Sequence, residues 1–349
     1  MSNLSEPLLC VSDLVVEFDT PAGPARAVDG MALTVHPHEL LCIVGESGSG
    51  KSVTMLATMG LLPATARIAA GQIRYKNREL SSLPAGEMRR LRGRELAMIF
   101  QDPMTSLNPT IRIGKQVGEI ITLHEPKASK ADVKRRVIDL LSQVNIPRPE
   151  YRYSAFPHQF SGGMRQRAMI AMAMAHAPAL LIADEPTTAL DVTIQAQILE
   201  VLRQMRERTG SAMVLITHDL GVVAETADRV VVMYSGRAME TGTVQEIFHD
   251  PQHPYTIGLL AGLLDMSGTG KTAYTIPGQP PALTRRPSGC PFHPRCALHQ
   301  GRDICRTTTP VLADSPSGRA ACHFANETAA WAAEKFPHIR RGPSGRASQ

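Results

Sequence analysis

Residues 40–52 read LLCIVGESGSGKS, and this stretch decides the fold class. Five apolar residues come first, as expected for a strand buried on both faces, and the rest fits the pattern G-x-x-x-x-G-K-[ST]. The run from Lys51 to Leu62 has a helical pattern and stops at Pro63. A strand, a glycine-rich loop and a helix in this order predict a site that holds the phosphates of a nucleotide.

Each residue type in this loop has a chemical reason. Glycines let backbone N–H groups turn inward toward phosphate oxygens, and the helix N-terminus adds its positive dipole. We expect the Lys51 ammonium to reach the β- and γ-phosphates and the Ser52 hydroxyl to ligate Mg²⁺. The expected nucleotide-binding residues are Gly45, Ser47, Gly48, Gly50, Lys51 and Ser52.

A second chemical signal is an apolar run that ends in two carboxylates, residues 180–185 (LLIADE). Asp184 at the end of a strand is suited to hold Mg²⁺, usually through water. Glu185 beside it is suited to polarise the attacking water. With the phosphate loop upstream, this pair predicts nucleotide hydrolysis.

The surrounding pattern predicts an α/β fold on a largely parallel sheet, because strands and helices alternate. Strands are expected at 8–18, 31–45, 96–100, 179–184, 212–216 and 229–233, and helices at 51–62, 130–145, 163–175 and 192–208. The charged helical stretch 102–160 is expected to be an insertion. Residues 266–349 hold 10 of the 26 prolines, so a loop-rich extension is expected there.

Charge and hydropathy exclude several classes of protein. Residues 1–265 hold 26 Lys and Arg against 28 Asp and Glu, whereas residues 266–349 hold 11 against 4. A near-neutral body argues against nucleic acid as a partner. No apolar run is long enough to span a bilayer, and the N-terminus lacks the features of a signal peptide, so we expect the chain to stay in the cytosol.

Residues 161–166 (SGGMRQ) form a second phosphate-binding device at the start of a predicted helix. Ser161 is suited to cap that helix, and Gly162 and Gly163 let the backbone approach an anion closely. No Asn is followed by Lys, so the base-reading motif of GTPases is missing.

With this loop the sequence resembles the ATP-binding cassette (ABC) ATPases over about residues 8–250. The resemblance implies a RecA-like P-loop core with an N-terminal antiparallel β part and a helical subdomain inserted at about 102–165. Further matching positions are Gln101 after LAMIF, Asp191 in the D-loop 188–191, the switch histidine His218, and Phe18 as the residue that stacks on adenine.

The resemblance also implies a mechanism in which each ATP lies between the phosphate loop of one subunit and the signature loop 161–166 of another. In it Glu185 is the general base, His218 stabilises the γ-phosphate, and Gln101 senses Mg²⁺ and couples to the membrane partner. ATP and Mg²⁺ are the implied ligands.

Three elements of the C-terminal part resemble the dipeptide/oligopeptide/nickel importer branch: HPYT at 253–256, PGQPP at 277–281 and GCPFHPRC at 289–296. The resemblance implies a peripheral ATPase subunit at the cytoplasmic face of the inner membrane. Its implied partners are a second related ATPase subunit, two transmembrane permeases and an extracytoplasmic solute-binding protein. Import of nickel or another small solute is the alternative, and a soluble ABC ATPase without a transport role is a third interpretation.

Cys290, Cys296, Cys305 and Cys322 are spaced C-x₅-C-x₈-C-x₁₆-C. In a reducing cytosol a metal site is favoured over disulfides, and the chemistry leaves Cys₄ zinc and an iron–sulfur cluster open. The resemblance favours a [4Fe–4S] cluster. Because the cysteines lie far along the chain from the phosphate loop, we expect little effect of this site on ATP hydrolysis. The expected domains are 1–265, 266–336 and a disordered tail, 337–349.

Overall fold

The computed structural model describes residues 6–188, 190–265 and 274–336. The chain divides into two compact units. The first takes in Val35–Glu39 and Arg74–Ile216 together with the start of the chain, and the second takes in Cys10–Thr34, Leu40–Ile73 and the part from Thr217 onward. The predicted disordered tail lies outside the described residues, as does Ala189 of the D-loop.

The first unit is built on three parallel strands in the order β8-β7-β6. Every residue of β7 (Leu180–Asp184) and of β8 (Ala212–Ile216) is buried, and β6 (Leu96–Ile99) is buried at all but one position. Continuous apolar runs of this kind are typical of strands covered on both faces. Asp184 is therefore the carboxylate at the end of a core strand.

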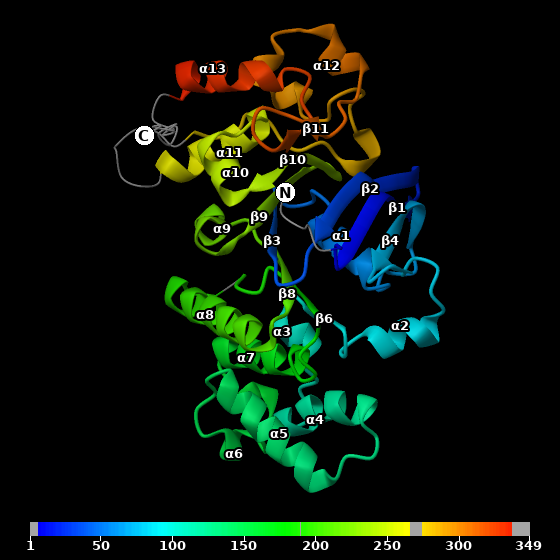
Figure 1. Ribbon diagram of the computed structural model, residues 1–349, viewed down its shortest axis with the longest axis vertical. Helices are drawn as coiled ribbons and strands as arrows, with labels where there is room; N and C mark the ends of the chain where they lie inside the picture. The colour runs from blue at the N-terminus through cyan, green and yellow to red at the C-terminus, as the bar shows by residue number, and fades with distance from the viewer. Residues whose placement is uncertain (1–5, 189, 266–273, 337–349) are drawn as a thin grey trace. The chain divides into compact units, whose positions relative to one another are not determined.

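Helices make up most of the rest of this unit, and Figure 1 draws α4 to α8 together in teal to green. Side chains cap three of them: Ser129 caps α5, Ser161 caps α7 and Asp191 caps α8. The elements are β5 (Arg78–Glu79), α2 (Ala85–Leu91), α3 (Pro103–Ser106), α4 (Ile113–His124), α5 (Lys130–Gln143), α6 (Pro149–Arg152), η1 (Pro157–Gln159), α7 (Gly162–Ala173) and α8 (Val192–Thr209).

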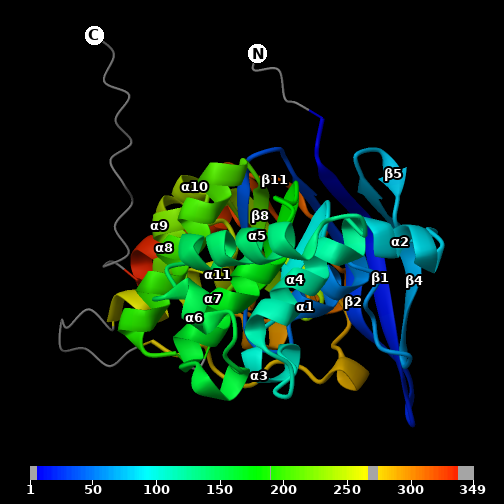
Figure 2. The same ribbon diagram turned by 90° about the horizontal axis from the view of Figure 1, so that it is seen from below.

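The second unit carries the phosphate loop. Its strands β3 (Leu40–Val44) and β9 (Arg229–Tyr234) pair in parallel, and β10 (Arg237–Thr243) continues antiparallel to β9. Three long strands form a separate antiparallel layer in the order β2-β1-β4, visible side by side in Figure 2. They are β1 (Leu9–Thr20), β2 (Gly23–Val35) and β4 (Ala66–Tyr75).

The C-terminal extension is more ordered than its composition suggests. It adds β12 (Arg319–Ala320) to the edge of β10, and β11 (Ala313–Asp314) pairs with β12. Helix α13 lies beside α11, where Phe336 packs against Ile257 and Ala261. The remaining elements of the second unit are α1 (Lys51–Thr58), α9 (Leu220–Thr226), α10 (Val244–His249), α11 (Pro254–Asp265), η2 (Leu283–Arg285), η3 (His293–Arg295), η4 (Ala297–His299), α12 (Asp303–Thr307) and α13 (Ala325–Lys335).

The predicted α/β class is confirmed, and the differences are local. The strand expected at 31–45 is two strands, because the chain turns at 36–39, where His38 has a φ of 63°. The helix expected to reach Leu62 ends at Thr58. Over the described ranges no helix is both long and apolar enough to cross a membrane.

Candidate nucleotide site

The phosphate loop joins β3 to α1, as predicted. Two of its glycines are needed because neighbouring backbone atoms leave no room for a side chain. Gly45 has a φ of 150°, and a Cβ there would overlap the carbonyl oxygen of Met233. Gly50 has a φ of 98°, and a Cβ there would come within 2.7 Å of the carbonyl oxygen of Ala27. Only glycine fits both positions, so the shape of the loop follows from these residues.

Lys51 lies under this loop, buried to 5% exposure. Its ammonium donates hydrogen bonds to the carbonyl oxygens of Gly45 at 2.7 Å and Glu46 at 3.0 Å. A buried lysine charge needs such partners, and stronger anionic partners replace carbonyls readily. Lys51 is therefore placed to bind phosphate oxygens that enter the loop.

A cavity of about 480 Å³ opens on the same loop. Val44, Gly45 and Glu46 line it together with His218 and with Leu259 of α11. The predicted switch histidine thus shares a cavity with the first residues of the phosphate loop. Asp219, the next residue, caps α9 through hydrogen bonds from the N–H groups of Gly221 and Val222, which fixes the start of that helix beside His218.

In the first unit, Glu185 follows β7 with a φ of 43°, a conformation that a non-glycine residue rarely adopts. Its carboxylate accepts hydrogen bonds from the Gln101 amide at 3.0 Å and from the Thr188 hydroxyl at 3.0 Å. The structure therefore brings together two residues, Gln101 and Glu185, that are 84 positions apart. A left-handed backbone at a non-glycine residue is a strained conformation of the kind that clusters at functional sites.

The signature loop also lies in the first unit. Ser161 caps α7 by accepting a hydrogen bond from the N–H of Met164 at 3.3 Å. A Cβ on Gly163 would come within 2.8 Å of the Ile194 side chain in α8, so this glycine allows close helix packing. Asp191, predicted to bind ATP, caps α8 through the N–H of Ile194 at 2.9 Å. Phe18 is half-buried on β1 in the second unit.

The residues present fit ATP and Mg²⁺. The loop leaves no room for a Cβ at Gly45 or Gly50, and a buried ammonium lies beneath it. The predicted Mg²⁺ ligands Ser52, Gln101 and Asp184 supply a hydroxyl, an amide and a carboxylate oxygen, which are the hard donors that Mg²⁺ prefers. When bound, Mg²⁺ would neutralise charge on the phosphates.

The expectation of an iron–sulfur cluster, or of zinc, at the four cysteines is wrong. In the described part of the chain, no group of three or more His, Cys, Asp or Glu side chains is arranged to hold a metal ion. The cysteines instead line a small, mostly apolar cavity with Phe292 and Phe324.

Burial favours the protonated form of these thiols. It raises the pKa of Cys290 and of Cys296 to about 12 and that of Cys322 to about 11, and it also raises the pKa of Cys305. The protonated thiols pack as small apolar side chains.

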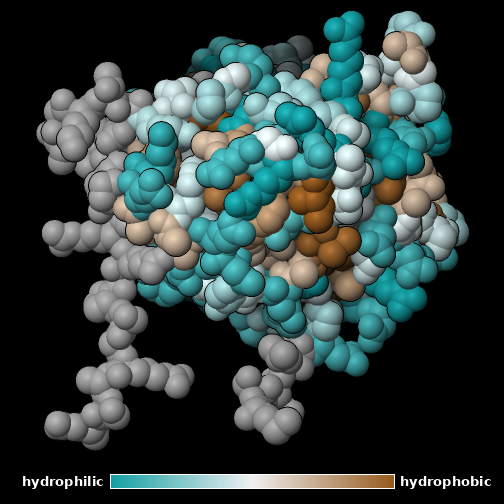
Figure 3. Space-filling model, turned by 90° about the horizontal axis from the view of Figure 1, so that it is seen from above, coloured by the Kyte–Doolittle hydropathy of each residue, from teal (hydrophilic) through white to brown (hydrophobic). Residues whose placement is uncertain are grey.

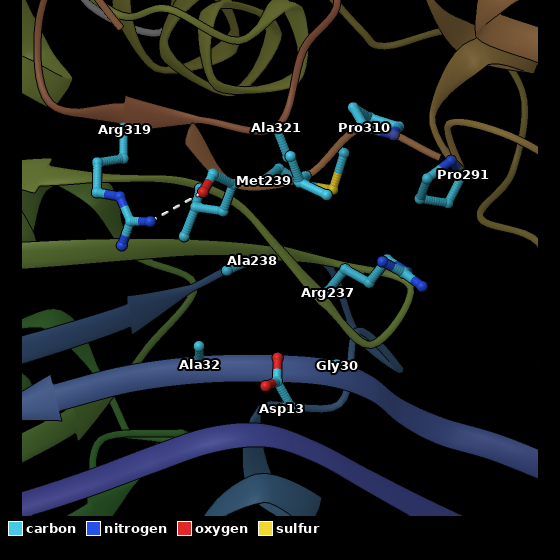
Figure 4. Close-up of a pocket in the computed structure, with 12 residues that line it drawn as sticks. Asp13, Gly30, Ala32, Arg237, Ala238, Met239, Pro291, Pro310, Arg319 and Ala321 are labelled. Carbon is cyan, nitrogen blue, oxygen red and sulfur yellow. Dashed lines mark hydrogen bonds between the residues drawn. The ribbon is translucent and has the colours of Figure 1, made fainter. Parts of the chain in front are cut away.

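A further cavity of about 280 Å³ lies where β2 and β10 meet the extension. Arg319 donates to the carbonyl of Leu312, and Figure 4 shows Pro291 and Pro310 at the other end of the cavity from Arg319. Apolar surface also appears in brown among hydrophilic residues in Figure 3, and in the extension Ile304 and Val311 expose large apolar side chains. No residue predicted to bind nucleotide lines this cavity.

Sequence reasoning missed three residues near the phosphate loop. Glu46 stands at a variable position of the loop motif, Tyr255 is part of HPYT, and Arg295 is part of GCPFHPRC. The side chain of Arg295 forms an ion pair with Glu46, 249 positions away, and the Tyr255 hydroxyl accepts the N–H of Glu46. The HPYT and GCPFHPRC motifs were the available signal, but no pattern indicated that they reach the loop.

Comparisons with known proteins agree with this geometry. The profile of a family described as "ABC transporter" matches residues 28–188, and one described as "Oligopeptide/dipeptide transporter, C-terminal region" matches residues 239–305. The oligopeptide transport ATP-binding protein OppD of Escherichia coli is 48% identical over 318 residues, which cover 91% of this chain and 93% of that protein. The dipeptide transport ATP-binding protein DppD of Bacillus subtilis is 52% identical over 83% of this chain and 87% of that protein.

Solved structures confirm the predicted P-loop fold. The ATP-binding cassette MJ0796 in a dimeric post-hydrolysis state with ADP and Pi has a TM-score of 0.61 at 24% identity, covering 68% of this chain and 98% of that one. The cbiO1 protein of Clostridium perfringens has a TM-score of 0.59 at 26% identity, covering 70% of this chain and 92% of that one.

Proposed function

The chain belongs to the ATP-binding subunits of ABC transporters that carry the oligopeptide/dipeptide C-terminal region, and we propose that it hydrolyses ATP to drive import of di- or oligopeptides. The observation that carries the peptide assignment is the joint match of both regions in one chain, together with relatives named for oligopeptide and dipeptide transport. Nickel is less well supported, because none of these names refers to it.

Lys51 and the backbone of the phosphate loop bind the β- and γ-phosphates in this proposal, and Phe18 stacks on adenine. Glu185 takes the proton of the attacking water, with its carboxylate held toward Gln101. His218, at the cavity that the loop opens on, stabilises charge on the γ-phosphate.

The signature residues Ser161, Gly162 and Gly163 act on the ATP of another subunit. The cap that Ser161 forms on α7 supports this role, because the N-terminus of that helix offers N–H groups to an anion. Asp191, as the cap of α8, positions the D-loop at the same subunit boundary.

The proposed assembly contains a second related ATPase subunit, two transmembrane permeases and an extracytoplasmic solute-binding protein. This chain is a peripheral subunit at the cytoplasmic face of the inner membrane. The dimeric state of MJ0796 supports pairing of ATPase subunits. We assign ATP hydrolysis to 1–265, with a helical subdomain at about 102–165, and treat 266–336 as a C-terminal extension of this domain.

Complementation tests the peptide assignment. A bacterial strain that lacks the ATPase subunit of its peptide importer is supplied with this chain and its cognate permeases and binding protein. Growth on a dipeptide as the sole source of a required amino acid is measured, with Glu185→Gln as the inactive control.

Growth on the dipeptide with the wild-type chain, and no growth with Glu185→Gln, supports the proposal. Uptake of ⁶³Ni²⁺ without peptide uptake would establish the nickel alternative instead. ATP hydrolysis by the chain with no uptake of either solute would favour a soluble ABC ATPase.

A further inference from the structure

Glu46 lies inside the phosphate loop, yet its side chain pairs with the C-terminal extension. Its two carboxylate oxygens accept hydrogen bonds from Arg295, Oε2 from Nη1 at 2.6 Å and Oε1 from Nη2 at 3.0 Å. The Arg295 side chain is only 5% exposed and that of Glu46 is 26% exposed. A two-point pair with this degree of burial fixes both partners in one geometry.

The extension holds Arg295 in turn. Its Nε donates to the carbonyl oxygen of Pro277 at 2.9 Å, and its Nη1 also donates to the Tyr234 hydroxyl at 3.3 Å. Burial acts to lower the pKa of Arg295, but the hydrogen bonds to Glu46 and Tyr234 outweigh it and raise that pKa. Pro277 opens the PGQPP element, so two of the extension's motifs meet at this guanidinium.

The third motif holds the backbone of the same loop residue. The N–H of Glu46 donates to the hydroxyl of Tyr255 at 2.9 Å. Tyr255 is fully buried, and its ring lies 4.8 Å from that of Tyr234 and 5.2 Å from that of Phe292, centre to centre. HPYT and GCPFHPRC therefore both contact one residue of the phosphate loop, and PGQPP supports this contact indirectly through Arg295.

The start of the helix that carries Tyr255 is fixed as well. The buried carboxyl group of Glu240 accepts the N–H of Gln252 at 2.6 Å and the N–H of His253 at 3.0 Å, just before α11 begins at Pro254. Tyr255 thus reaches Glu46 from a helix whose first turn is fixed.

We propose that Arg295 and Tyr255 are positioning residues for ATP binding, and that the C-terminal extension sets the affinity of the phosphate loop through Arg295. Arg295 neutralises the Glu46 carboxylate, whose negative charge would otherwise repel the phosphates of ATP. Tyr255 holds the backbone of Glu46 in place through its N–H. A preset and neutralised loop binds phosphates without reordering, so affinity depends on the extension.

The electrostatic part of the proposal gives a distinctive pattern. Removing Arg295 alone leaves Glu46 unpaired and repelling the nucleotide, whereas removing both charges leaves no repulsion. Truncating one partner of a buried pair is more damaging than replacing both. The double variant is therefore expected to bind ATP better than the Arg295 variant. A purely structural role is distinguished by kcat, which loss of folded chain would lower and loss of nucleotide affinity alone would not.

The experiment measures binding of a fluorescent ATP analogue (mant-ATP) with Mg²⁺, and separately kcat and KM for ATP, on the full-length chain. Arg295→Met is expected to raise Kd and KM about tenfold with kcat within about twofold, and Glu46→Gln with Arg295→Met to recover about threefold of that loss. Arg302→Met is the matched control. It removes the same side chain from the same extension, where Arg302 pairs with Glu327 at 2.8 Å, and wild-type Kd is expected.

A Kd for Arg295→Met within twofold of wild type overturns the proposal, and so does a double variant no better than the single one. If circular dichroism shows that Arg295→Met is unfolded, Tyr255→Phe decides, because it removes only the hydroxyl that accepts the Glu46 N–H. A folded Tyr255→Phe chain with Kd raised about threefold supports the proposal, and an unchanged Kd contradicts it. The inference rests on ATP binding by this loop, which the wild-type chain and Lys51→Ala report independently.

Discussion

The phosphate loop in the second unit and the Glu185 loop in the first are held in different ways. The phosphate loop is surrounded by buried groups: Lys51 beneath it, Met233 and Ala27 against its glycines, and Arg295 on Glu46. Glu185 is held by hydrogen bonds from Gln101, which is exposed, and from the partly buried Thr188.

This difference separates two tasks. Buried contacts fix the loop that binds the nucleotide before the nucleotide arrives. Partners at the surface leave Glu185, the proposed general base, able to exchange them when ATP and Mg²⁺ bind. We therefore expect substitutions in the two regions to change different constants. Substitutions around the phosphate loop should change Kd for ATP, and substitutions around Glu185 should change kcat.

The largest effect is expected for Glu185→Gln. The amide keeps the shape and the contact with Gln101 but cannot take a proton from water, so kcat should fall about a thousandfold while ATP affinity is retained. Phosphate release and mant-ATP binding on the same preparation measure both. Turnover near the wild-type rate would refute the general-base role.

Lys51→Ala is expected to act on binding instead. Without the buried ammonium the loop loses its countercharge to the β- and γ-phosphates, and Kd for ATP should rise about a hundredfold. Isothermal titration with ATP and Mg²⁺ measures this rise. The control is Lys76→Ala, which removes a lysine paired with Glu95 on the surface. Equal affinity in Lys51→Ala and wild type would contradict the assignment of this loop.

His253→Asn tests whether His253 is buried in its neutral form, in which its Nδ1 accepts the N–H of Tyr255. Burial lowers the pKa of His253 from its ordinary 6.5 to about 3, so below pH 6.5 the unfolded chain takes up a proton that the folded chain refuses. Wild-type stability should therefore fall with pH from about 6.5 toward 3, by about 2 kcal/mol at pH 5 from this group.

Asn keeps an acceptor for the N–H of Tyr255, which His253 Nδ1 accepts at 3.0 Å, but it does not titrate. Urea unfolding of both chains at pH 7 and pH 5 should show a smaller acid loss in His253→Asn by about that amount. An equal loss in both chains would show that the histidine is not held neutral in the folded state.

Ser161→Ala is expected to have the smallest effect and to act on a partner. Loss of the cap weakens the anion site at the start of α7, and turnover at the site completed by this residue should fall about tenfold. The experiment uses mixed dimers of one Ser161→Ala chain and one unchanged chain, with radiolabelled nucleotide bound to the unchanged chain. Loss of hydrolysis of this labelled nucleotide shows that Ser161 acts on the partner's site. A defect confined to the mutated subunit's own phosphate loop would break the split-site proposal.

Much of the fold followed from the sequence because its signals are local. The apolar runs at 180–184 and 212–216 are buried strands, and the phosphate loop lies between β3 and α1 as its motif requires. Strands with mixed patterns such as β4 and the helix α11 were not predicted, since neither has a clear period in the sequence.

The contacts of the extension were not predictable in the same way. Sequence spacing gave no sign that Arg295 meets Glu46, because ion pairs across 249 positions leave no periodic pattern. The cysteine spacing suggested a metal, but spacing along the chain does not report how the four side chains are arranged in space, and in the described residues they form no metal-binding group. Tertiary contacts, which composition and spacing do not report, determine both the Arg295–Glu46 pair and the arrangement of the cysteines.

The most direct test of the separation between binding and chemistry measures Kd for mant-ATP and kcat for ATP on Glu185→Gln and Arg295→Met side by side. We predict that Glu185→Gln lowers kcat with Kd unchanged, and that Arg295→Met raises Kd with kcat nearly unchanged. If both variants changed the same constant, that result would contradict separate regions for nucleotide binding and for chemistry.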